Sequence, residues 1–367
     1  MKQIEIFLKN ILLRLLLLLS KPNNSGKRNL GAAHSKILFI RLNRIGDALV
    51  TTPLLHLVKQ KLNARIYVLA DKKNHFIFTN NPAIDKVVVF NKGIKGLNEV
   101  LKFIKQENFD TIVDLHDDVS ATVSLIIALS KIESKFGLEK ENKIIYTKTT
   151  PRLDSKTVHV VDRILEIAKL FNINLAHEQK SIHFYPEEES ILAAHEFIST
   201  SFDKDNFLVG INISAGSEAR FWGVENFAAF VKFLLNFASR KKIGIVILCA
   251  PTEIHYANEI VRLNLEYFES RKIVISAHKF DEFAAIISKL NLLVTPDTSA
   301  VHLAAAFGVP VFGIYVKDTA EMIWSAYGVD FECITTSNSN LHNLNFETVK
   351  NKFQPFFEKI LLEKTKI

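Results

Sequence analysis

Gly46 and Asp47 stand just after the first strongly apolar run that reads as a strand. The run "KILFI" (residues 36–40) predicts a buried strand, and a helix-like stretch follows over residues 49–61. Glycine permits a tight turn with a positive φ at such a junction. An aspartate there can cap the helix or serve as a general base at the edge of a cleft, and the residues alone leave both interpretations open.

A second stretch has the residue types of a phosphate-binding loop. The segment "GINISAGSEARFW" (residues 210–222) runs from a predicted strand into small residues, then a cation, then a predicted helix. Small residues such as Gly216 and Ser217 let backbone N–H groups approach phosphate oxygens, and Arg220 can add a bidentate contact. The alternative is a solvated loop arginine. The sequence has neither a Walker motif nor G-x-G-x-x-G, which argues against an ordinary ATPase or dinucleotide site.

A third stretch, "TPDTSAVHLAAAFG" (residues 295–308), joins a predicted strand to a helix of small residues. Asp297, Thr298 and Ser299 are suited to cap that helix, whose N-terminus favours an anion. His302 lies four residues after Thr298 and hence on the same helical face. A lone histidine is more often structural, but beside a second phosphate-type loop this one is a candidate ligand contact.

Three aspartates in "DLHDD" (residues 114–118) raise the question of a metal site. No further cluster of carboxylates or histidines completes a ligand set for Asp114, Asp117 and Asp118. We therefore expect solvated loop acids and no metal.

Predicted strands alternate with helix-like stretches on both sides of a polar connection near residues 178–190. The strands are expected at 36–42, 65–70, 86–90 and 110–115, and then at 207–213, 243–250, 272–277, 292–296 and 310–316. Helices are expected between them, for instance at 49–61 and 97–106. Such alternation of apolar strands with helices indicates parallel sheets covered on both faces. The expected fold class is α/β, with Rossmann-like domains over 36–180 and 190–345 and a C-terminal helix over 346–367.

Length and charge set further limits. A chain of 367 residues predicts about two domains. Its net charge of +7 lies almost wholly in residues 1–36, where seven Lys and Arg face one Glu, so the rest offers no broad nucleic-acid surface. The two cysteines, Cys249 and Cys333, have no metal-ligand spacing and suit a reducing cytoplasm.

Residues 1–35 combine leucines with cations. The stretch "IEIFLKNILLRLLLLLS" (residues 4–20) is short for a membrane span and is interrupted by Lys9 and Arg14. We expect a basic amphipathic helix in the membrane interface, followed by a linker. The alternative is an apolar helix docked on the protein's own surface.

Together the three candidate loops resemble those of glycosyltransferase family 9, the lipopolysaccharide heptosyltransferases. Residues 46–53 match the family's G-D-x-x-x-T-x-P segment, residues 212–222 align with its N-P-G-A-S-W-P-T-K-R-W pattern, and residues 297–306 align with D-T-G-x-x-H-L-A-A-A. The sequence departs from the family where Arg220 replaces Lys, Ser299 replaces Gly, and Ile213-Ser214 replaces Pro-Gly. Arginine keeps the charge of lysine but changes the hydrogen-bond geometry.

The resemblance implies a GT-B fold, in which two Rossmann-like domains face a central cleft. The N-terminal domain would bind a lipid-anchored glycan acceptor, and the C-terminal domain an ADP-sugar. Asp47 would be the catalytic base of an inverting transfer that needs no metal or other cofactor. The acceptor-side loop would comprise Asn43, Arg44 and Gly46, and the nucleotide-sugar site Gly216, Ser217, Arg220, Glu253, Asp297, Thr298, Ser299 and His302.

The resemblance also implies a peripheral enzyme on the cytoplasmic side of the inner membrane, with no nucleic-acid partner. Three other interpretations stay open at this point. They are a transferase that uses another nucleotide sugar for surface glycans, a GT-B scaffold that binds nucleotide or glycan without turnover, and a sugar-nucleotide epimerase.

Overall fold

The computed structural model describes residues 36–237, 242–270, 272–316, 323–336 and 338–364. The chain divides into two compact units, Met1–Phe184 and Tyr185–Ile367. The predicted interfacial arm over residues 1–35 lies outside the described residues. Within the described ranges, no helix combines the length and the apolar character needed to cross a bilayer.

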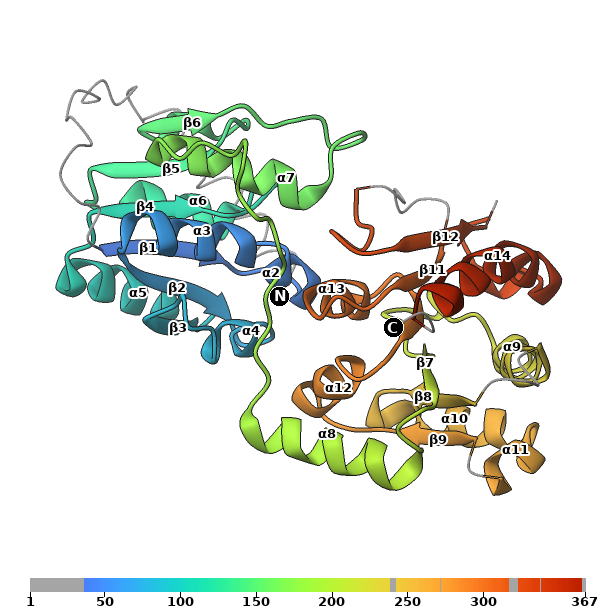
Figure 1. The fold of residues 1–367 in the computed structure, drawn as a ribbon. Helices are drawn as coiled ribbons and strands as arrows, with labels where there is room; N and C mark the ends of the chain where they lie inside the picture. Colours follow the sequence, from blue (N-terminus) through green and yellow to red (C-terminus); the bar gives the residue numbers. More distant parts are fainter. Residues whose placement is uncertain (1–35, 238–241, 271, 317–322, 337, 365–367) are drawn as a thin grey trace. The chain divides into compact units, whose positions relative to one another are not determined.

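The first unit is built on a six-stranded parallel sheet in the order β3-β2-β1-β4-β5-β6 (Figure 1). Its strands are β1 (Lys36–Arg41), β2 (Arg65–Asp71), β3 (Lys86–Phe90), β4 (Thr111–Asp114), β5 (Ser134–Leu138) and β6 (Lys148–Thr150). Its helices are α2 (Ile45–Leu49), α3 (Thr52–Leu62), α4 (Phe76–Thr79), α5 (Ile94–Glu107), α6 (Ala121–Leu129) and α7 (Val160–Leu165), with 3-10 turns η1 (Lys143–Ile145) and η2 (Glu166–Phe171).

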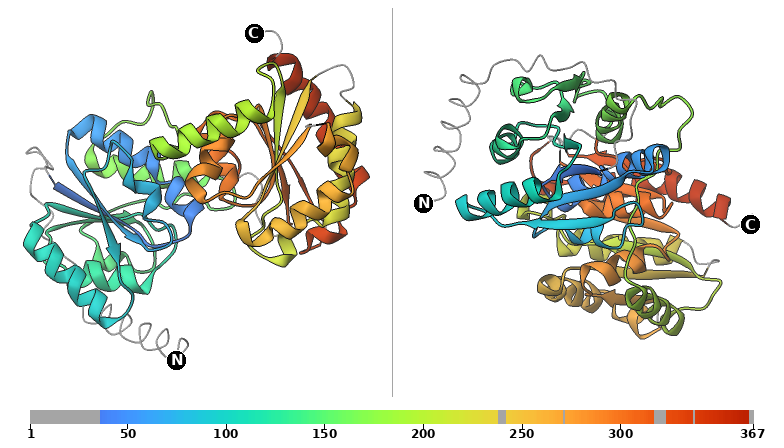
Figure 2. Two further views of the ribbon diagram at one scale, coloured as in Figure 1. Left: turned by 90° about the horizontal axis from the view of Figure 1, so that it is seen from below. Right: turned by 90° about the vertical axis from the view of Figure 1, so that its left-hand side faces the viewer.

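Both faces of this sheet are covered, as the apolar strands predict (Figure 2). Leu38 and Ile40 of β1 share one core with Val100 of α5 and Ile126 of α6. Phe39, which points to the opposite face, packs against the ring of Phe171 in η2 at a centroid distance of 6.4 Å. The alternation along β1 thus places apolar side chains in two layers of helix packing.

The second unit repeats the same strand order. Its sheet runs β12-β11-β10-β7-β8-β9, all parallel. The strands are β7 (Phe207–Asn212), β8 (Ile243–Leu248), β9 (Ile273–Ser276), β10 (Leu292–Pro296), β11 (Val311–Tyr315) and β12 (Phe331–Thr335). The helices are α8 (Glu188–Ser201), α9 (Val224–Phe237), α10 (Ile254–Arg262), α11 (Leu265–Glu269), α12 (Phe280–Ile287), α13 (Ser299–Ala306) and α14 (Phe346–Lys364), with 3-10 turns η3 (Glu218–Arg220), η4 (Pro251–Glu253) and η5 (Leu341–Asn343).

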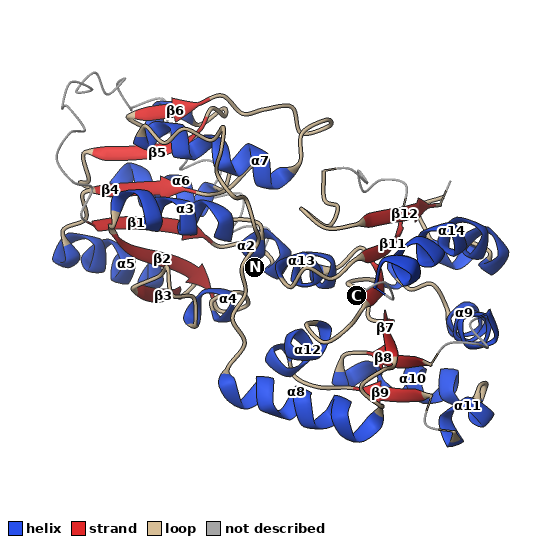
Figure 3. Cartoon of the chain, in the orientation of Figure 1, coloured by secondary structure: helices blue, strands red, loops and turns tan. Residues whose placement is uncertain are grey.

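The C-terminal helix α14 packs within the second unit (Figure 3). Phe353 meets Phe312 of β11 edge-on at 5.1 Å between ring centroids, and Phe357 meets Phe207 of β7 at 5.8 Å. The indole of Trp222 is fully buried in the same core and donates its Nε1–H to the Leu344 carbonyl at 2.7 Å. Through these contacts α14 covers the face of the sheet that lies opposite to α12 and α13.

Each of the nine predicted strands overlaps a strand of the structure, so the expected α/β class and parallel sheets are confirmed. The prediction missed β5, β6 and β12. Lys135 and Gly137 interrupt the apolar pattern of β5, and β6 is only three residues long. The side chains of β12 are half-buried at a sheet edge, which leaves a weak pattern. The predicted helix at 49–61 corresponds to α3, and the short helix α2, which was not predicted, precedes it.

Candidate active site

In each unit the candidate residues follow strands at the centre of the sheet. The strand order reverses between β1 and β4 in the first unit and between β7 and β10 in the second. Loops at the carboxyl ends of such strands form the ligand sites of open α/β sheets. Asp47 lies in the short helix α2 just after β1, and Asp297 lies in the loop after β10, so both stand beyond the carboxyl ends of these strands.

Asp47 lies inside α2 and does not cap it. The N-cap residue is Arg44, and no side chain makes a capping hydrogen bond there. The capping interpretation of Asp47 is therefore wrong. The expected positive φ at Gly46 is also wrong, because Gly46 is helical and the described glycines with positive φ are Gly93, Gly223, Gly308 and Gly328.

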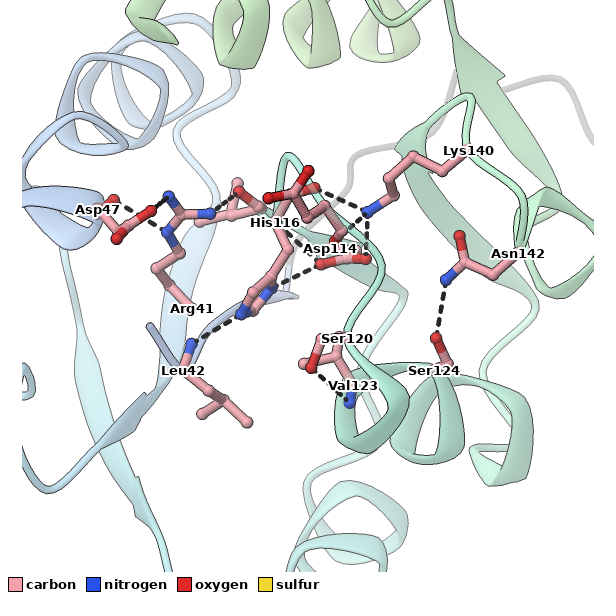
Figure 4. Close-up of polar contacts among 12 residues, drawn as sticks. Arg41, Leu42, Asp47, Asp114, His116, Ser120, Val123, Ser124, Lys140 and Asn142 are labelled. Atoms are coloured by element: carbon pink, nitrogen blue, oxygen red, sulfur yellow. Dashed lines mark hydrogen bonds and ion pairs between the residues drawn. The ribbon is translucent and has the colours of Figure 1, made fainter. Parts of the chain in front are cut away.

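The carboxylate of Asp47 is instead held by Arg41 (Figure 4). Arg41 ends β1 and is fully buried. Its Nη2 donates to Asp47 Oδ1 at 2.9 Å, and its Nε donates to the Asp47 carbonyl oxygen at 2.9 Å. The Asp47 side chain is 20% exposed, and its second oxygen, Oδ2, accepts no hydrogen bond from any described residue. One oxygen of the carboxylate is thus fixed while the other is available.

Asp114, at the end of β4, anchors a buried polar network and is not the solvated loop acid that we expected. Its Oδ2 accepts from Lys140 Nζ at 2.9 Å and from the Tyr146 hydroxyl at 2.6 Å. Its Oδ1 accepts from the backbone N–H of His116 at 2.9 Å and contacts Nδ1 of the same residue at 2.8 Å. Burial alone would raise the pKa of Asp114, but the charge of Lys140 and these hydrogen bonds hold it well below its usual range. Asp114 is therefore an anion.

His116 connects this network to the loop that carries Asp47. Its Nε2 accepts from the backbone N–H of Leu42 at 3.1 Å, so the proton of a neutral ring resides on Nδ1, facing Asp114. Burial lowers the pKa of His116, although the charge of Asp114 opposes this effect. The ring is thus neutral near pH 7, with a fixed tautomer.

Asp117 also departs from the expectation of a solvated acid, whereas Asp118 meets it. The Asp117 side chain is 14% exposed and pairs with Arg163 at 3.1 Å and Arg152 at 3.2 Å. The Asp118 side chain is 88% exposed. Among the described residues, no group of three or more His, Cys, Asp or Glu is arranged to hold a metal ion.

The other predicted residues of the first loop are exposed. The side chains of Asn43 and Arg44 face solvent. Asn74, buried beyond the end of β2, holds their backbone: its Nδ2 donates to the carbonyl oxygens of Arg41 at 3.1 Å and Asn43 at 2.8 Å. Arg41, His116 and Asn74 were not among the predicted site residues, since nothing in the local sequence marks a buried polar residue whose partner lies in another loop.

In the second unit, Arg220 and Asp297 lie together although 77 positions separate them. Nη1 of Arg220 donates to the Asp297 carbonyl oxygen at 3.1 Å and lies 3.4 Å from the carboxylate Oδ2. The Nε and Nη2 groups of Arg220 donate to no described residue, and its side chain is 26% exposed. The guanidinium is thus anchored at one nitrogen and retains donors for an anion.

Thr298 caps α13 as predicted. Its hydroxyl accepts from the Ala300 N–H at 3.3 Å. Asn212, at the end of β7, donates from Nδ2 to this hydroxyl at 3.2 Å and to the Thr295 hydroxyl at 2.9 Å. Ser299 is the first residue of the helix. The backbone N–H groups of the first turn of α13 therefore lie beyond the carboxyl ends of β7 and β10, where the strand order reverses.

Glu253 lies at a neighbouring loop. Its carboxylate accepts from the Ser214 hydroxyl, whose oxygen in turn accepts from the Ala250 N–H at 2.7 Å. Ser214 therefore ties the loop after β7 to the loop after β8. This role of Ser214 was not predicted from the sequence, where the residue stands out only as a departure from the family pattern. Its one local signal is a hydroxyl close after the end of a strand.

The remaining predicted residues differ in exposure. Gly216 and Ser217 are exposed, and a Cβ built at Gly216 would meet nothing within 4 Å. Open space beside that backbone suits a ligand in close contact. His302 is 4% exposed, and its ring lies 5.9 Å from that of Trp324.

Each unit thus holds chemistry of one kind. The first presents a carboxylate oxygen that can take a proton, and the second presents an arginine and a helix N-terminus that can bind an anion. These are the groups that a group transfer from a phosphorylated donor to a hydroxyl requires.

Comparisons with known proteins identify the family. The family model of glycosyltransferase family 9 (heptosyltransferase) matches residues 98–353. The chain is 21% identical over 288 residues to the lipopolysaccharide core heptosyltransferase OpsX of Haemophilus influenzae, a match that covers 77% of this chain and 79% of that protein.

Solved structures show the fold. A glycosyl transferase of family 9 from Veillonella parvula superposes with a TM-score of 0.75 at 22% identity, covering 92% of this chain and all of that one. The Escherichia coli ADP-heptose lps heptosyltransferase II gives a TM-score of 0.69 at 16% identity, covering 90% of this chain and 99% of that one. The two Rossmann-like units are therefore those of a GT-B fold, and the chain belongs to glycosyltransferase family 9, the heptosyltransferases.

Proposed function

We propose that the protein is an inverting heptosyltransferase. It moves a heptose from ADP-heptose to the core of a lipopolysaccharide or lipooligosaccharide. Family membership supports a sugar transfer from a nucleotide sugar to a glycan. The name of the Haemophilus relative supports the core acceptor, and the name of the Escherichia coli enzyme supports the donor.

In this reaction Asp47 is the general base. The acceptor hydroxyl gives its proton to the carboxylate as its oxygen forms a bond to the anomeric carbon of the donor. The bond from that carbon to the diphosphate oxygen breaks, the electron pair stays on the oxygen, and ADP leaves. Attack opposite the leaving group inverts the anomeric configuration. A positioned base contributes on the order of 10²–10⁴ in rate.

The departing diphosphate is stabilised by groups of the second unit. The unengaged nitrogens of Arg220, the N–H groups at the start of α13 and the backbone beside Gly216 are donors for its oxygens. Glu253 is proposed as a ribose contact. Because a guanidinium and a helix N-terminus supply positive charge at the leaving group, we propose that the transfer needs neither a metal nor another cofactor.

We further propose that the enzyme works on the cytoplasmic side of the inner membrane and attaches there through residues 1–35. Residues 1–35 hold six Lys and Arg against one Glu, together with many leucines, and this composition supports attraction to anionic headgroups. An acceptor anchored in a lipid would be reached from that surface.

The observation that carries the proposal is the state of Asp47, with Oδ1 bound to Arg41 and Oδ2 available on a partly exposed side chain. The test is incubation of the full chain with ADP-heptose, other ADP- and UDP-sugars and truncated lipopolysaccharide acceptors, read by mass spectrometry. We expect an acceptor-dependent gain of one heptose. No mass gain with any donor would refute the transferase function, and a gain only from another donor would change the sugar.

Two variants separate the roles of the units in the same assay. Asp47→Asn should lower the rate of transfer on the order of 10²–10⁴-fold, the contribution of a positioned base, while ADP binding, measured by calorimetry, stays within about twofold. Arg220→Ala should weaken ADP binding at least about tenfold, since a charge-assisted hydrogen bond contributes about 1.5–3 kcal/mol. Asp47→Asn with full transfer, or Arg220→Ala with unaltered ADP affinity, would contradict these roles.

A further inference from the structure

We infer that Arg41 is a positioning residue that decides which oxygen of Asp47 takes the proton. The inference rests on the proposed function of Asp47 as base. Arg41 contacts no reacting atom, because its guanidinium is fully buried beneath the loop. It acts through Asp47 alone.

Three arms of the guanidinium are engaged, so Arg41 cannot turn away from Asp47. Nη2 donates to Asp47 Oδ1 and Nε to the carbonyl oxygen of the same residue, both at 2.9 Å. Nη1 donates to the carbonyl oxygen of Leu115 beyond β4. One planar group therefore fixes the backbone and the carboxylate of Asp47 together and ties both to the neighbouring strand.

The main chain around Arg41 is fixed by two further buried side chains. His116 accepts from the Leu42 N–H at 3.1 Å, and Asn74 donates to the carbonyl oxygens of Arg41 and Asn43. These residues come from the loops after β4 and β2, on either side of β1. The loop is thus held from both neighbouring strands, and the carboxylate plane of Asp47 is set before any ligand arrives.

Oδ2 is consequently the proton acceptor. Oδ1 is already bound to a cation, so a proton placed there would displace the Arg41 hydrogen bond, whereas Oδ2 has no donor among the described residues. The proton moves from the acceptor hydroxyl to Oδ2, and the electron pair of that O–H bond goes to the new bond at the anomeric carbon.

Arg41 keeps an anion nearby after this proton transfer. Burial lowers the pKa of Arg41, while the charges of Asp47 and then Asp114 oppose that effect. Asp114 stays ionised because its pKa is held well below the usual range. When Asp47 becomes neutral, the charge of Asp114 still acts on the buried guanidinium of Arg41.

The test is a kinetic double-mutant cycle on the full chain, with Arg41→Met, Asp47→Asn and the double variant. We expect Arg41→Met to lower kcat on the order of 10²-fold, the effect of a misplaced catalytic group, with donor KM within about twofold. In the Asp47→Asn background the same change should lower the residual rate by less than about threefold, because a positioning residue has nothing left to position. If Arg41→Met lowers the rate by the same factor in the wild-type and the Asp47→Asn backgrounds, the inference is overturned.

Two variants guard against a trivial loss of fold. Arg41→Lys keeps the positive charge but loses the planar guanidinium with its several N–H donors. We expect its kcat to be about tenfold higher than that of Arg41→Met. Arg65→Met removes an exposed arginine at the far end of β2 in the same unit and should leave kcat unchanged. If the lysine variant folds and is no faster than Arg41→Met, the inference fails.

Failure of the inference is distinguishable from failure of the proposed function. Wild-type transfer with an unimpaired Arg41→Met variant overturns the positioning role and leaves the function intact. Absence of transfer by the wild-type chain with every donor and acceptor overturns both.

Discussion

Lys140→Met should destabilise the first unit by leaving a buried carboxylate without its cation. Lys140 and Asp114 are each 1% exposed and lie 2.9 Å apart. Methionine keeps most of the side-chain length but removes the charge and the second hydrogen bond of Lys140, which runs to the His116 carbonyl oxygen at 2.7 Å. The variant therefore tests the buried network without opening a large cavity.

The size of the effect follows from the burial. Breaking a buried ion pair by removal of one partner costs about 3–5 kcal/mol, because the remaining charge is uncompensated. At about 2–4 °C per kcal/mol for a unit of this size, the midpoint of thermal unfolding should fall by roughly 6–20 °C. Asp114→Asn combined with Lys140→Met should recover part of that loss, since the carboxylate left without Lys140 is then removed as well.

The assay uses the distribution of tryptophan. Both tryptophans, Trp222 and Trp324, lie in the second unit. Circular dichroism at 222 nm follows the helices of both units, so a chain of two units need not show a single transition. We expect Lys140→Met to lower the dichroism midpoint of the first unit and to leave the tryptophan fluorescence midpoint unchanged.

Lys143→Met is the matched control. Lys143 lies three positions further on, its side chain is 59% exposed, and it pairs with Glu139 at the surface. Exposed pairs contribute about 0–1 kcal/mol, so this variant should melt within a few degrees of wild type. Equal effects of the two lysine variants, or a fluorescence midpoint that falls together with the dichroism midpoint, would refute the reasoning.

Two further predictions concern pH and the membrane. His183 stacks on His56 at 3.7 Å, and burial, followed by the charge of His56, lowers the pKa of His183 to about 4. In the unfolded chain His183 binds a proton near pH 6.5, whereas in the folded chain it does so only near pH 4. The contribution of neutral His183 to the free energy of unfolding is therefore fully present above about pH 6.5 and is lost as the pH falls towards 4. His183→Gln should flatten that dependence in dichroism melts, and an unchanged slope would contradict it. The full chain should sediment with anionic vesicles at low salt while a chain lacking residues 1–35 should not, and equal sedimentation would contradict the role of that segment.

The sequence predicts the sheets well because burial on both faces requires continuous apolar runs. Runs such as 243–250 and 292–296 therefore mark β8 and β10 almost to the residue. The same logic fails where a strand carries polar residues with distant partners. Lys135 in β5 is 9% exposed although the local sequence reads as a solvated segment, because its backbone pairs with β4 and its N–H reaches Thr147. Such strands depend on long-range contacts.

The candidate site shows the same limit. Thr298 was predictable as a cap, since a cap is a local property of a helix end. Whether Asp47 caps α2 or binds Arg41 depends on the orientation of the Arg41 side chain, which lies six residues earlier on β1. No local sequence pattern encodes that orientation. Asp114 looked like a loop acid because its partners Lys140 and Tyr146 lie 26 and 32 positions away.

The two units share one strand order but present groups of opposite charge, and this difference supports the substrates that we propose for each unit. Beyond β1 and β4, where the strand order of the first unit reverses, the buried guanidinium of Arg41 binds Asp47. The group exposed to solvent there is the carboxylate of Asp47. An anionic diphosphate would be repelled there, whereas a neutral hydroxyl finds a proton acceptor. Where β7 and β10 diverge, neutral Asn212 and Thr298 open the N-terminus of α13, and Arg220 adds donors beside it. A helix N-terminus beside a cation favours an anion, and this supports our proposal that the nucleotide sugar binds the second unit and the attacking hydroxyl the first.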